Sequence, residues 1–84
     1  MNKIGVKYRG RLASLAGAAE EALEAQNVEG LFGSIRQSYG REAEKYARSM
    51  LITVNGESIV LLKSYKTPLA DGDVVCFFPL SAGG

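Results

Sequence analysis

The residues from Asn27 to Gly40 form the helical pattern that most constrains how this chain of 84 residues can fold. Asn27 suits an N-cap, Glu29 suits the first turn near the positive end of the helix dipole, and Gly40 suits a left-handed C-terminal cap. Gly30 and Gly33 each cost about 1 kcal/mol relative to alanine inside a helix, so this helix must depend on packing. Its apolar positions share one face, which we interpret as core rather than as a binding groove: Val28, Leu31, Phe32, Ile35 and Tyr39.

Four further segments carry strand patterns. Residues 4–9 alternate, with Ile4, Val6 and Tyr8 on the apolar side. Residues 51–54 run into the tight-turn pair Asn55-Gly56, and residues 57–63 return from it. A polar turn at residues 71–73 then precedes an apolar strand at residues 74–78.

Three segments are harder to assign. Residues 18–26 have helical propensity but almost no apolar stripe, and a helix there would leave the first strand without a hairpin partner. We therefore predict an edge strand, with a helix as the alternative. Residues 10–17 are predicted to form a loop whose Leu12 and Leu15 reach the core, and residues 41–50 to form a second, shorter helix with a solvated charged face.

Strands gathered around one principal helix predict a single α+β domain over residues 1–84, with the helix packed across one face of the sheet. The first and last strands are the most apolar and are expected to be neighbours at its centre. An 84-residue chain is long enough for one small core but not for a roomy internal pocket.

The C-terminal end of the sequence carries its main candidate for a reactive group. Pro79 has no N–H and ends the last strand, and residues 80–84 are expected to form a mobile tail. Five extended residues reach about 17 Å, long enough to enter another protein's active site. Gly83 and Gly84 lack a Cβ and can pass a narrow channel. The free carboxylate of Gly84 is then the reactive group.

Composition excludes several classes of function. The sequence has no histidine, which rules out histidine-based catalytic and metal sites, and its single cysteine rules out multi-cysteine clusters. A net charge of +1 without a basic run argues against nucleic acid as a partner. No apolar run approaches the roughly 20 residues of a membrane span, and no signal-peptide pattern is present, so a cytoplasmic location is expected.

The pleat of the last strand predicts a partner surface. If Val75 and Phe77 face the helix, Phe78 points away from it beside the tail. We expect Phe78 to contact a partner, the alternative being that a loop around Leu62 or Tyr65 covers it. The expected partner-binding residues are those from the end of the strand into the tail: Phe78, Pro79, Leu80, Ser81, Ala82 and Gly83.

Several motifs together resemble a known family. They are Ile52-Thr53-Val54-Asn55-Gly56, Thr67-Pro68-Leu69-Ala70-Asp71-Gly72-Asp73-Val74-Val75, Phe77-Phe78-Pro79 and Ala82-Gly83-Gly84. The chain resembles the MoaD/ThiS sulfur carriers, which are small ubiquitin-like β-grasp proteins with a mixed sheet. The Phe-Phe-Pro step and the Ala-Gly-Gly end are closer to MoaD, the molybdopterin synthase small subunit, although Leu80 stands where the family usually has a second proline.

The resemblance implies that the protein is a co-substrate rather than an enzyme, with the catalytic residues on its partners. An ATP-using, ubiquitin-activating-type enzyme would adenylate Gly84, and a sulfur donor would convert it to a thiocarboxylate. In the MoaD case the large subunit of molybdopterin synthase would receive the sulfur for molybdenum or tungsten cofactor biosynthesis. The carrier itself is expected to bind no cofactor.

Other functions fit the same tail. The chain could be a ThiS-like thiazole carrier, a ubiquitin-like modifier conjugated to lysines through Gly84, or a plain β-grasp interaction module. A persulfide on Cys76 is a weaker alternative, because a mid-strand thiol is poorly exposed and lacks a nearby cation to lower its pKa.

Overall fold

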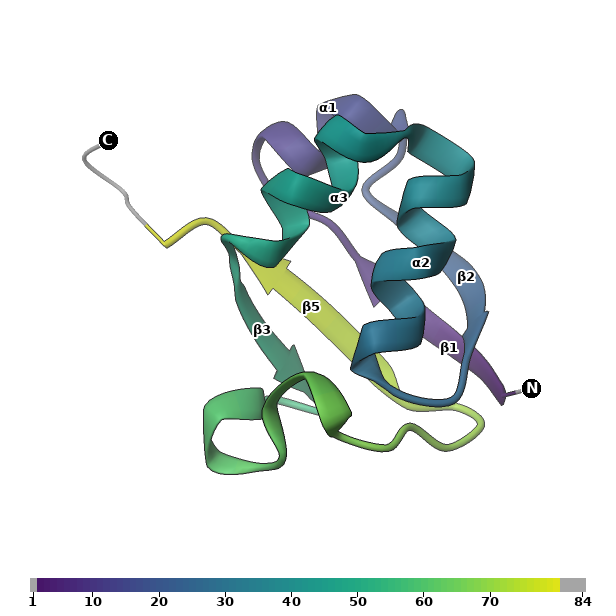
Figure 1. The fold of residues 1–84 in the computed structure, drawn as a ribbon, viewed down its shortest axis with the longest axis vertical. Coiled ribbons are helices and arrows are strands. Elements are labelled where there is room, and N and C mark those ends of the chain that lie inside the picture. The colour runs from purple at the N-terminus through teal and green to yellow at the C-terminus, as the bar shows by residue number, and fades with distance from the viewer. Residues whose placement is uncertain (1, 81–84) are drawn as a thin grey trace.

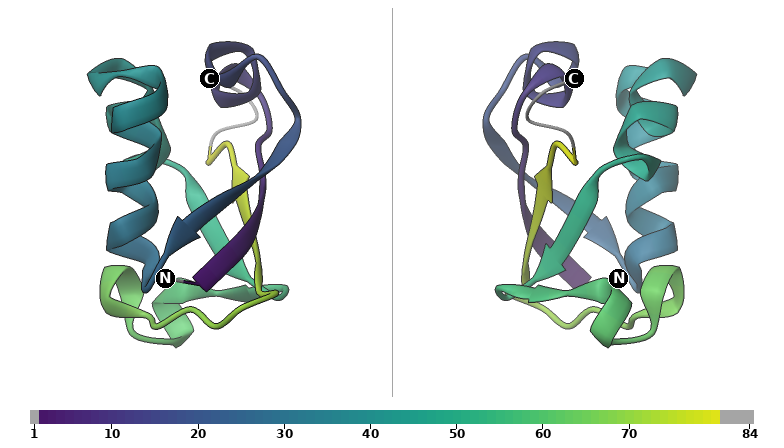
Figure 2. Two further views of the ribbon diagram at one scale, coloured as in Figure 1. Left: turned by 90° about the vertical axis from the view of Figure 1, so that its right-hand side faces the viewer. Right: turned by 90° about the vertical axis from the view of Figure 1, so that its left-hand side faces the viewer.

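One long helix lies across a twisted sheet in the computed structural model, which describes residues 2–80 (Figures 1 and 2). Two short helices and a pair of 3-10 turns complete the fold. The elements in chain order are β1 (Asn2–Lys7), α1 (Arg11–Ala16), β2 (Glu20–Ala25), α2 (Val28–Tyr39), α3 (Arg41–Arg48), β3 (Leu51–Val54), β4 (Glu57–Ser58), η1 (Ile59–Leu61), η2 (Ser64–Lys66) and β5 (Val74–Phe78).

The sheet has the strand order β2-β1-β5-β3-β4. β1 and β5 run parallel, with Gly5 opposite Val74 and Val6 opposite Val75, whereas the other neighbouring pairs are antiparallel. The expected α+β class, the mixed sheet and the central pairing of the first and last strands are therefore confirmed.

The core fills the space between α2 and the inner face of the sheet. The four apolar residues of the first three turns of α2 are buried as predicted, and Tyr39 packs against them at the end of the helix. Ile4 and Val6 from β1, and Val75 and Phe77 from β5, are fully buried opposite them. The apolar residues that recur along one face of the helix and at alternate positions of the strands therefore pack together in one core layer.

β2 is an edge strand, as the sequence analysis expected against its helical propensity. Its pairing with β1 brings Glu21 onto the inner face, where it accepts hydrogen bonds from the hydroxyls of Tyr8 at 2.6 Å and Tyr39 at 2.5 Å. These bonds favour the neutral phenols and, together with burial, raise the pKa of Tyr39 to about 12. These hydrogen bonds from residues distant in the sequence stabilise the strand over the helix that the local propensity favours.

Two predicted segments differ from the structure. The predicted loop 10–17 contains helix α1, because Leu12 and Leu15 are spaced to face the core from one side of a helical turn. The predicted return strand 57–63 ends at Ser58, whose hydroxyl accepts a hydrogen bond from the Val60 amide and starts η1. An edge position in the sheet buries Ile59 but cannot bury the whole apolar run that follows.

Smaller differences concern the helix ends. Gly40 does end α2 with a positive φ of 96°, but its ψ of 176° is not that of a left-handed helical cap, and the same residue starts α3. α3 ends at Arg48, two residues before the predicted end, although Met50 is buried as expected. In residues 2–80 no helix is long and apolar enough to cross a membrane.

Replacing Gly33 by alanine is expected to stabilise the protein by about 1 kcal/mol, the cost of glycine inside a helix. A Cβ added there would meet no heavy atom within 4 Å, so nothing opposes the gain. Urea unfolding of both proteins measures the difference. Gly30→Ala is the matched control, since its Cβ would lie 3.4 Å from the Ala25 Cβ and the Asn27 Oδ1. A larger gain at Gly30 than at Gly33 would contradict the prediction.

Asp73 is expected to make the protein sensitive to acid. Its carboxylate accepts hydrogen bonds from the Ala70 amide at 2.8 Å and from the Asn55 side chain at 3.1 Å, which hold its pKa below the usual value. The ionised form is favoured in the folded state, so its contribution to stability is present above about pH 4 and is lost as the pH falls through the folded-state pKa. The stability difference between wild type and Asp73→Asn should thus shrink between pH 7 and pH 3 in urea unfolding. A difference that stays constant over this range would show that Asp73 does not contribute in this way.

Candidate functional site

The predicted site lies at the end of β5, and only part of it falls within the described residues. Phe78 is the last residue of β5, and Pro79 and Leu80 follow it with exposed side chains. Ser81, Ala82, Gly83 and Gly84, and with them most of the expected mobile tail 80–84, lie outside the described residues.

The chain just after β1 packs against this end of β5. Because β1 and β5 are parallel, they finish at the same edge of the sheet. The Arg9 guanidinium lies over the Phe78 ring, with its central carbon 5.7 Å from the ring centroid. A Cβ added at Gly10 would come within 3.0 Å of the Pro79 Cγ, so the backbone passes there with almost no space to spare. Phe78 and Pro79 are thus held from one side.

Phe78 points away from α2, as the pleat predicted. Val75 and Phe77 are fully buried, whereas Val74, Cys76 and Phe78 lie on the opposite face and are half-buried. Leu51 of β3 is directly across from Phe78 and is 39% exposed. The side chain lying over Phe78 is that of Arg9, while the ring of Tyr65, which is 36% exposed, meets the Phe32 ring edge to face. The open face therefore presents Phe78 and Leu51 side by side next to Pro79.

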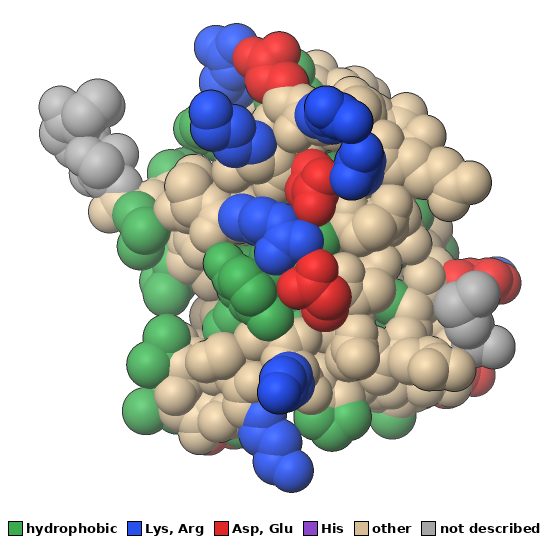
Figure 3. Space-filling model, viewed as in Figure 1, with side chains coloured by type: hydrophobic (Ala, Val, Ile, Leu, Met, Phe, Trp, Pro, Cys, Tyr) green, Lys and Arg blue, Asp and Glu red, His purple; other side chains and the backbone are tan. Residues whose placement is uncertain are grey.

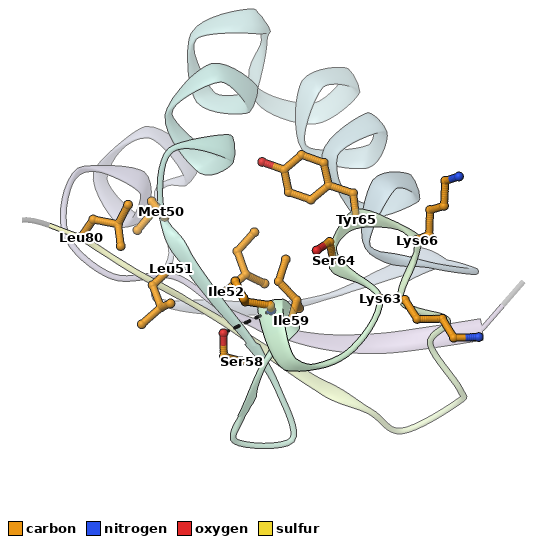
Figure 4. Close-up of a pocket in the computed structure, with 11 residues that line it drawn as sticks. Met50, Leu51, Ile52, Ser58, Ile59, Lys63, Ser64, Tyr65, Lys66 and Leu80 are labelled. Carbon is orange, nitrogen blue, oxygen red and sulfur yellow. Dashed lines mark hydrogen bonds between the residues drawn. The ribbon is translucent and has the colours of Figure 1, made fainter.

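A second apolar surface, which the sequence analysis did not find, lies beside Leu80. It is a groove of about 590 Å³ between β3, the two 3-10 turns and the end of β5. Figure 3 shows hydrophobic side chains gathered around a hollow on this side of the molecule. We call it the tail-root groove. It is lined by Met50, Leu51, Ile52, Ser58, Ile59, Val60, Lys63, Ser64, Tyr65, Lys66 and Leu80 (Figure 4). The apolar Val60, which is 74% exposed, was the available signal, but its assignment to a strand concealed it.

Tyr65 forms the wall opposite β3 and is fixed by the helices. Its ring meets the Phe32 ring edge to face, with centroids 4.9 Å apart, and its hydroxyl donates to the Arg48 carbonyl at 3.1 Å. The Arg48 guanidinium lies 4.3 Å from the Phe32 centroid and pairs with Glu29 at 2.6 Å and Glu44 at 3.0 Å. Hydrogen bonding to Arg48 lowers the pKa of Glu29. The wall is thus part of a connected polar and aromatic network.

The groove has a positive rim. Lys63 and Lys66 come from η2 and the turn before it, and in Figure 4 their side chains point outward from the apolar lining. Within residues 2–80 neither lysine forms an ion pair. Over the same residues no group of three histidine, cysteine, aspartate or glutamate side chains could hold a metal ion. The groove therefore combines an apolar lining with two lysines at its rim.

A mixed five-stranded sheet crossed by one principal helix, with a central strand leading to the C-terminus, defines a ubiquitin-like β-grasp protein. The model of the ThiS family matches residues 6–84, and the chain belongs to this family. The expected family is therefore confirmed. Its members are ubiquitin-like sulfur carriers and are generally not catalysts themselves. No curated protein matches the sequence.

Solved structures agree with this assignment. The small archaeal modifier protein 1 of Methanosarcina acetivorans is 27% identical, with a TM-score of 0.85 over 100% of this chain and 98% of that one. A putative molybdopterin converting factor subunit 1 of Pyrococcus furiosus is 33% identical, with a TM-score of 0.76 over 94% and 98%. A chain of the protein-protein complex of subunits 1 and 2 of molybdopterin-converting factor from Helicobacter pylori shares the fold at 21% identity, with a TM-score of 0.68 over 98% of this chain and 99% of that one.

Gly10→Ala is expected to destabilise the protein by more than the roughly 1–2 kcal/mol that a positive φ costs a residue with a side chain. Its φ of 61° and ψ of −140° lie close to a region that only glycine commonly adopts, and the new Cβ would lie only 3.0 Å from the Pro79 Cγ. Gly17→Ala is the comparison, because Gly17 has φ 72° and ψ 17°, in the ordinary left-handed region, and no heavy atom lies within 4 Å of its added Cβ. Thermal unfolding of both variants measures the two losses. A loss at Gly10 no larger than the loss at Gly17 would contradict the prediction.

Proposed function

We propose that this protein is the sulfur-carrying small subunit of a molybdopterin synthase and that Gly84 carries the sulfur as a thiocarboxylate. The observation that carries the proposal is that the ThiS family match extends to residue 84 and so includes the Gly-Gly end. The 33% identical protein described as a molybdopterin converting factor subunit supports the choice of pathway.

The chemistry follows from the properties of a C-terminal carboxyl. Its pKa is near 3.5, so at neutral pH Gly84 bears a carboxylate, which is a poor electrophile. We propose that an adenylating enzyme uses ATP to form a Gly84 acyl-adenylate and releases pyrophosphate. A hydrosulfide equivalent then attacks the carbonyl carbon, the C–S bond forms, and AMP leaves with the electrons of the C–O bond. The product is a thiocarboxylate, whose sulfur is a better nucleophile than the original oxygen.

The acceptor in this proposal is a pterin precursor held by the large synthase subunit, which incorporates the sulfur into a dithiolene. The catalytic groups belong to the partners, and no cofactor is assigned to the carrier itself. The half-buried Phe78, with Pro79 and Leu80 exposed beyond it, would contact the partner that receives the tail. We place these reactions in the cytoplasm, where ATP is available and Cys76 stays reduced.

A protein modifier is the second candidate. The structural similarity to an archaeal modifier protein, at 27% identity over the whole chain, favours it. Both candidates require adenylation of the same glycine. In the carrier, hydrosulfide displaces AMP and the resulting sulfur then attacks an acceptor, whereas in the modifier a lysine amine attacks the activated carbonyl carbon and displaces its leaving group to form an amide.

Intact-mass measurement of the protein from its native host distinguishes the candidates. The carrier predicts a fraction in which one oxygen is replaced by sulfur, whereas the modifier predicts heavier conjugates linked through lysine. Deleting Gly84 should abolish both while the unfolding free energy stays unchanged. A matched variant, Gly83→Ala, keeps the chain length and tests whether the reaction requires a residue without a Cβ at position 83. The purified protein can also be incubated with ATP, sulfide and the adenylating enzyme encoded in the same genome. If the wild type then acquires no sulfur, and protein from the host carries neither sulfur nor conjugates, the proposal is wrong.

A further inference from the structure

β2 is the outermost strand on one side of the sheet, and its outer edge carries backbone groups that no strand pairs (Figure 1). The register with β1 decides which groups these are. The Tyr8 amide, just after β1, donates to the Ala19 carbonyl at 2.8 Å, and hydrogen-bonded pairs recur at every second residue of an antiparallel ladder. The residues between these pairs, Glu20, Ala22 and Glu24, therefore direct their N–H and C=O groups away from β1.

Two contacts agree with this direction. Gly5 is directly opposite Ala22 and donates its amide to the Asp73 carbonyl at 2.9 Å, on the β5 side, rather than to β2. The Glu24 carbonyl accepts a hydrogen bond from the Ser34 hydroxyl of α2 at 3.1 Å, as an outward carbonyl can. Within residues 2–80 the three outward amides have no hydrogen-bond partner. The edge thus presents a row of aligned donors and acceptors to another chain.

A groove of about 400 Å³ lies between this edge and α2, and we call it the edge groove. Gly30, Gly33 and Ser34 form its helix side. A Cβ added at Gly33 would meet no heavy atom within 4 Å, so the space above the helix backbone is open there. An extended chain laid along β2 therefore has room for small side chains on the inner side of the sheet, while its backbone pairs with the strand.

The charges on β2 select the kind of chain that can be added. The side chains of Glu20 and Glu24 are exposed on the outer face and form no ion pair within residues 2–80. The register places Lys7 and Lys3 of β1 directly across from them, so the sign of the charge alternates from β1 to β2. Lysine or arginine on a third strand would continue this alternation, and opposite charges on neighbouring strands stabilise a sheet.

A second copy of this chain fits the edge poorly. Antiparallel pairing of β2 with β2 about a twofold axis at Ala22 would put Glu20 of each copy opposite Glu24 of the other. Like charges directly opposite each other destabilise a pair of strands, and charged side chains on edge strands prevent such pairing. The edge therefore disfavours a copy of itself and favours a basic strand.

We propose that the outer edge of β2 is a strand-addition site for an extended, basic segment of another protein. The segment pairs its backbone with Ala22 and Glu24, places lysine or arginine opposite Glu20 and Glu24, and directs small side chains into the edge groove beside Gly33. β1 separates this edge from β5, so the site lies away from the C-terminal end of the described chain. It goes beyond the function proposed above and requires no reaction at Gly84.

Amide hydrogen exchange, measured by nuclear magnetic resonance with a synthetic peptide, tests the site. The outward positions of the peptide are lysine, threonine and lysine, with valine between them, and a control peptide carries glutamate in place of each lysine. At saturating lysine peptide the Ala22 and Glu24 amides should exchange at least about tenfold more slowly, because they gain hydrogen bonds. The Leu23 amide is already paired with β1 and should change by less than about twofold.

Variants of β2 separate the backbone contribution from the charge. Ala22→Pro removes one outward N–H and no bond to β1, at the kind of edge position where proline is tolerated, and should abolish peptide binding. Glu20→Gln combined with Glu24→Gln should weaken binding of the lysine peptide by about tenfold at low salt, and by less as salt is added. Glu57→Gln on β4, at the other edge of the sheet, is the control and should leave the affinity unchanged within about twofold.

Each outcome supports or overturns the proposal. If neither peptide binds up to its solubility limit, or if both bind equally, the inference is wrong. If the Ala22 and Glu24 amides of the protein alone become protected as its concentration rises, the edge pairs with a second copy, and the inference is overturned. The unfolding midpoint shows whether each variant is folded. If Ala22→Pro does not fold, the exchange pattern and the glutamine double variant still decide.

Discussion

The parallel pairing of β5 with β1 at the centre of the sheet is the constraint on which the rest of the structure depends. β5 has neighbours on both sides, and its alternate residues Val75 and Phe77 close the core beneath α2. The same strand delivers Phe78 to the open face and Pro79 to the edge where β1 also ends. Core closure and the placement of the C-terminal segment are therefore consequences of a single strand, and a substitution within it affects both.

The strongest local patterns were sufficient to predict most of the fold. α2 combines a capping Asn27, whose side chain accepts from the Gly30 amide, with an apolar face that has no competing interpretation. The Asn55-Gly56 turn has positive φ at both residues, which few other pairs allow. Such elements follow from nearby residues alone. Strand β2 required knowledge of its neighbours, since only the two tyrosine hydroxyls explain a glutamate on its inner face.

The site was harder to predict, because it depends on contacts between distant segments. The prediction that Phe78 and Pro79 contact a partner came from the strand pattern and from the position of these residues beside the tail. The position of Arg9 over Phe78 and the close approach of Gly10 to Pro79 depend on β1 and β5 being parallel. The groove was missed because a run of four apolar residues predicts a strand, whereas the strand ends at Ser58 and the 3-10 turn that follows buries Ile59 and leaves Val60 and Leu61 exposed.

The central place of β5 also sets the order in which this domain can form. Without β5 the two halves of the sheet, the β1–β2 pair and the β3–β4 pair, are not joined to each other, because β5 lies between them. Closing the sheet therefore waits for the contact that is most distant along the chain, and such contacts slow folding. During synthesis on the ribosome, the two hairpins therefore cannot form a stable sheet before β5 is made. The complete sheet can form only after residues 74–78 have left the ribosome and paired with both β1 and β3.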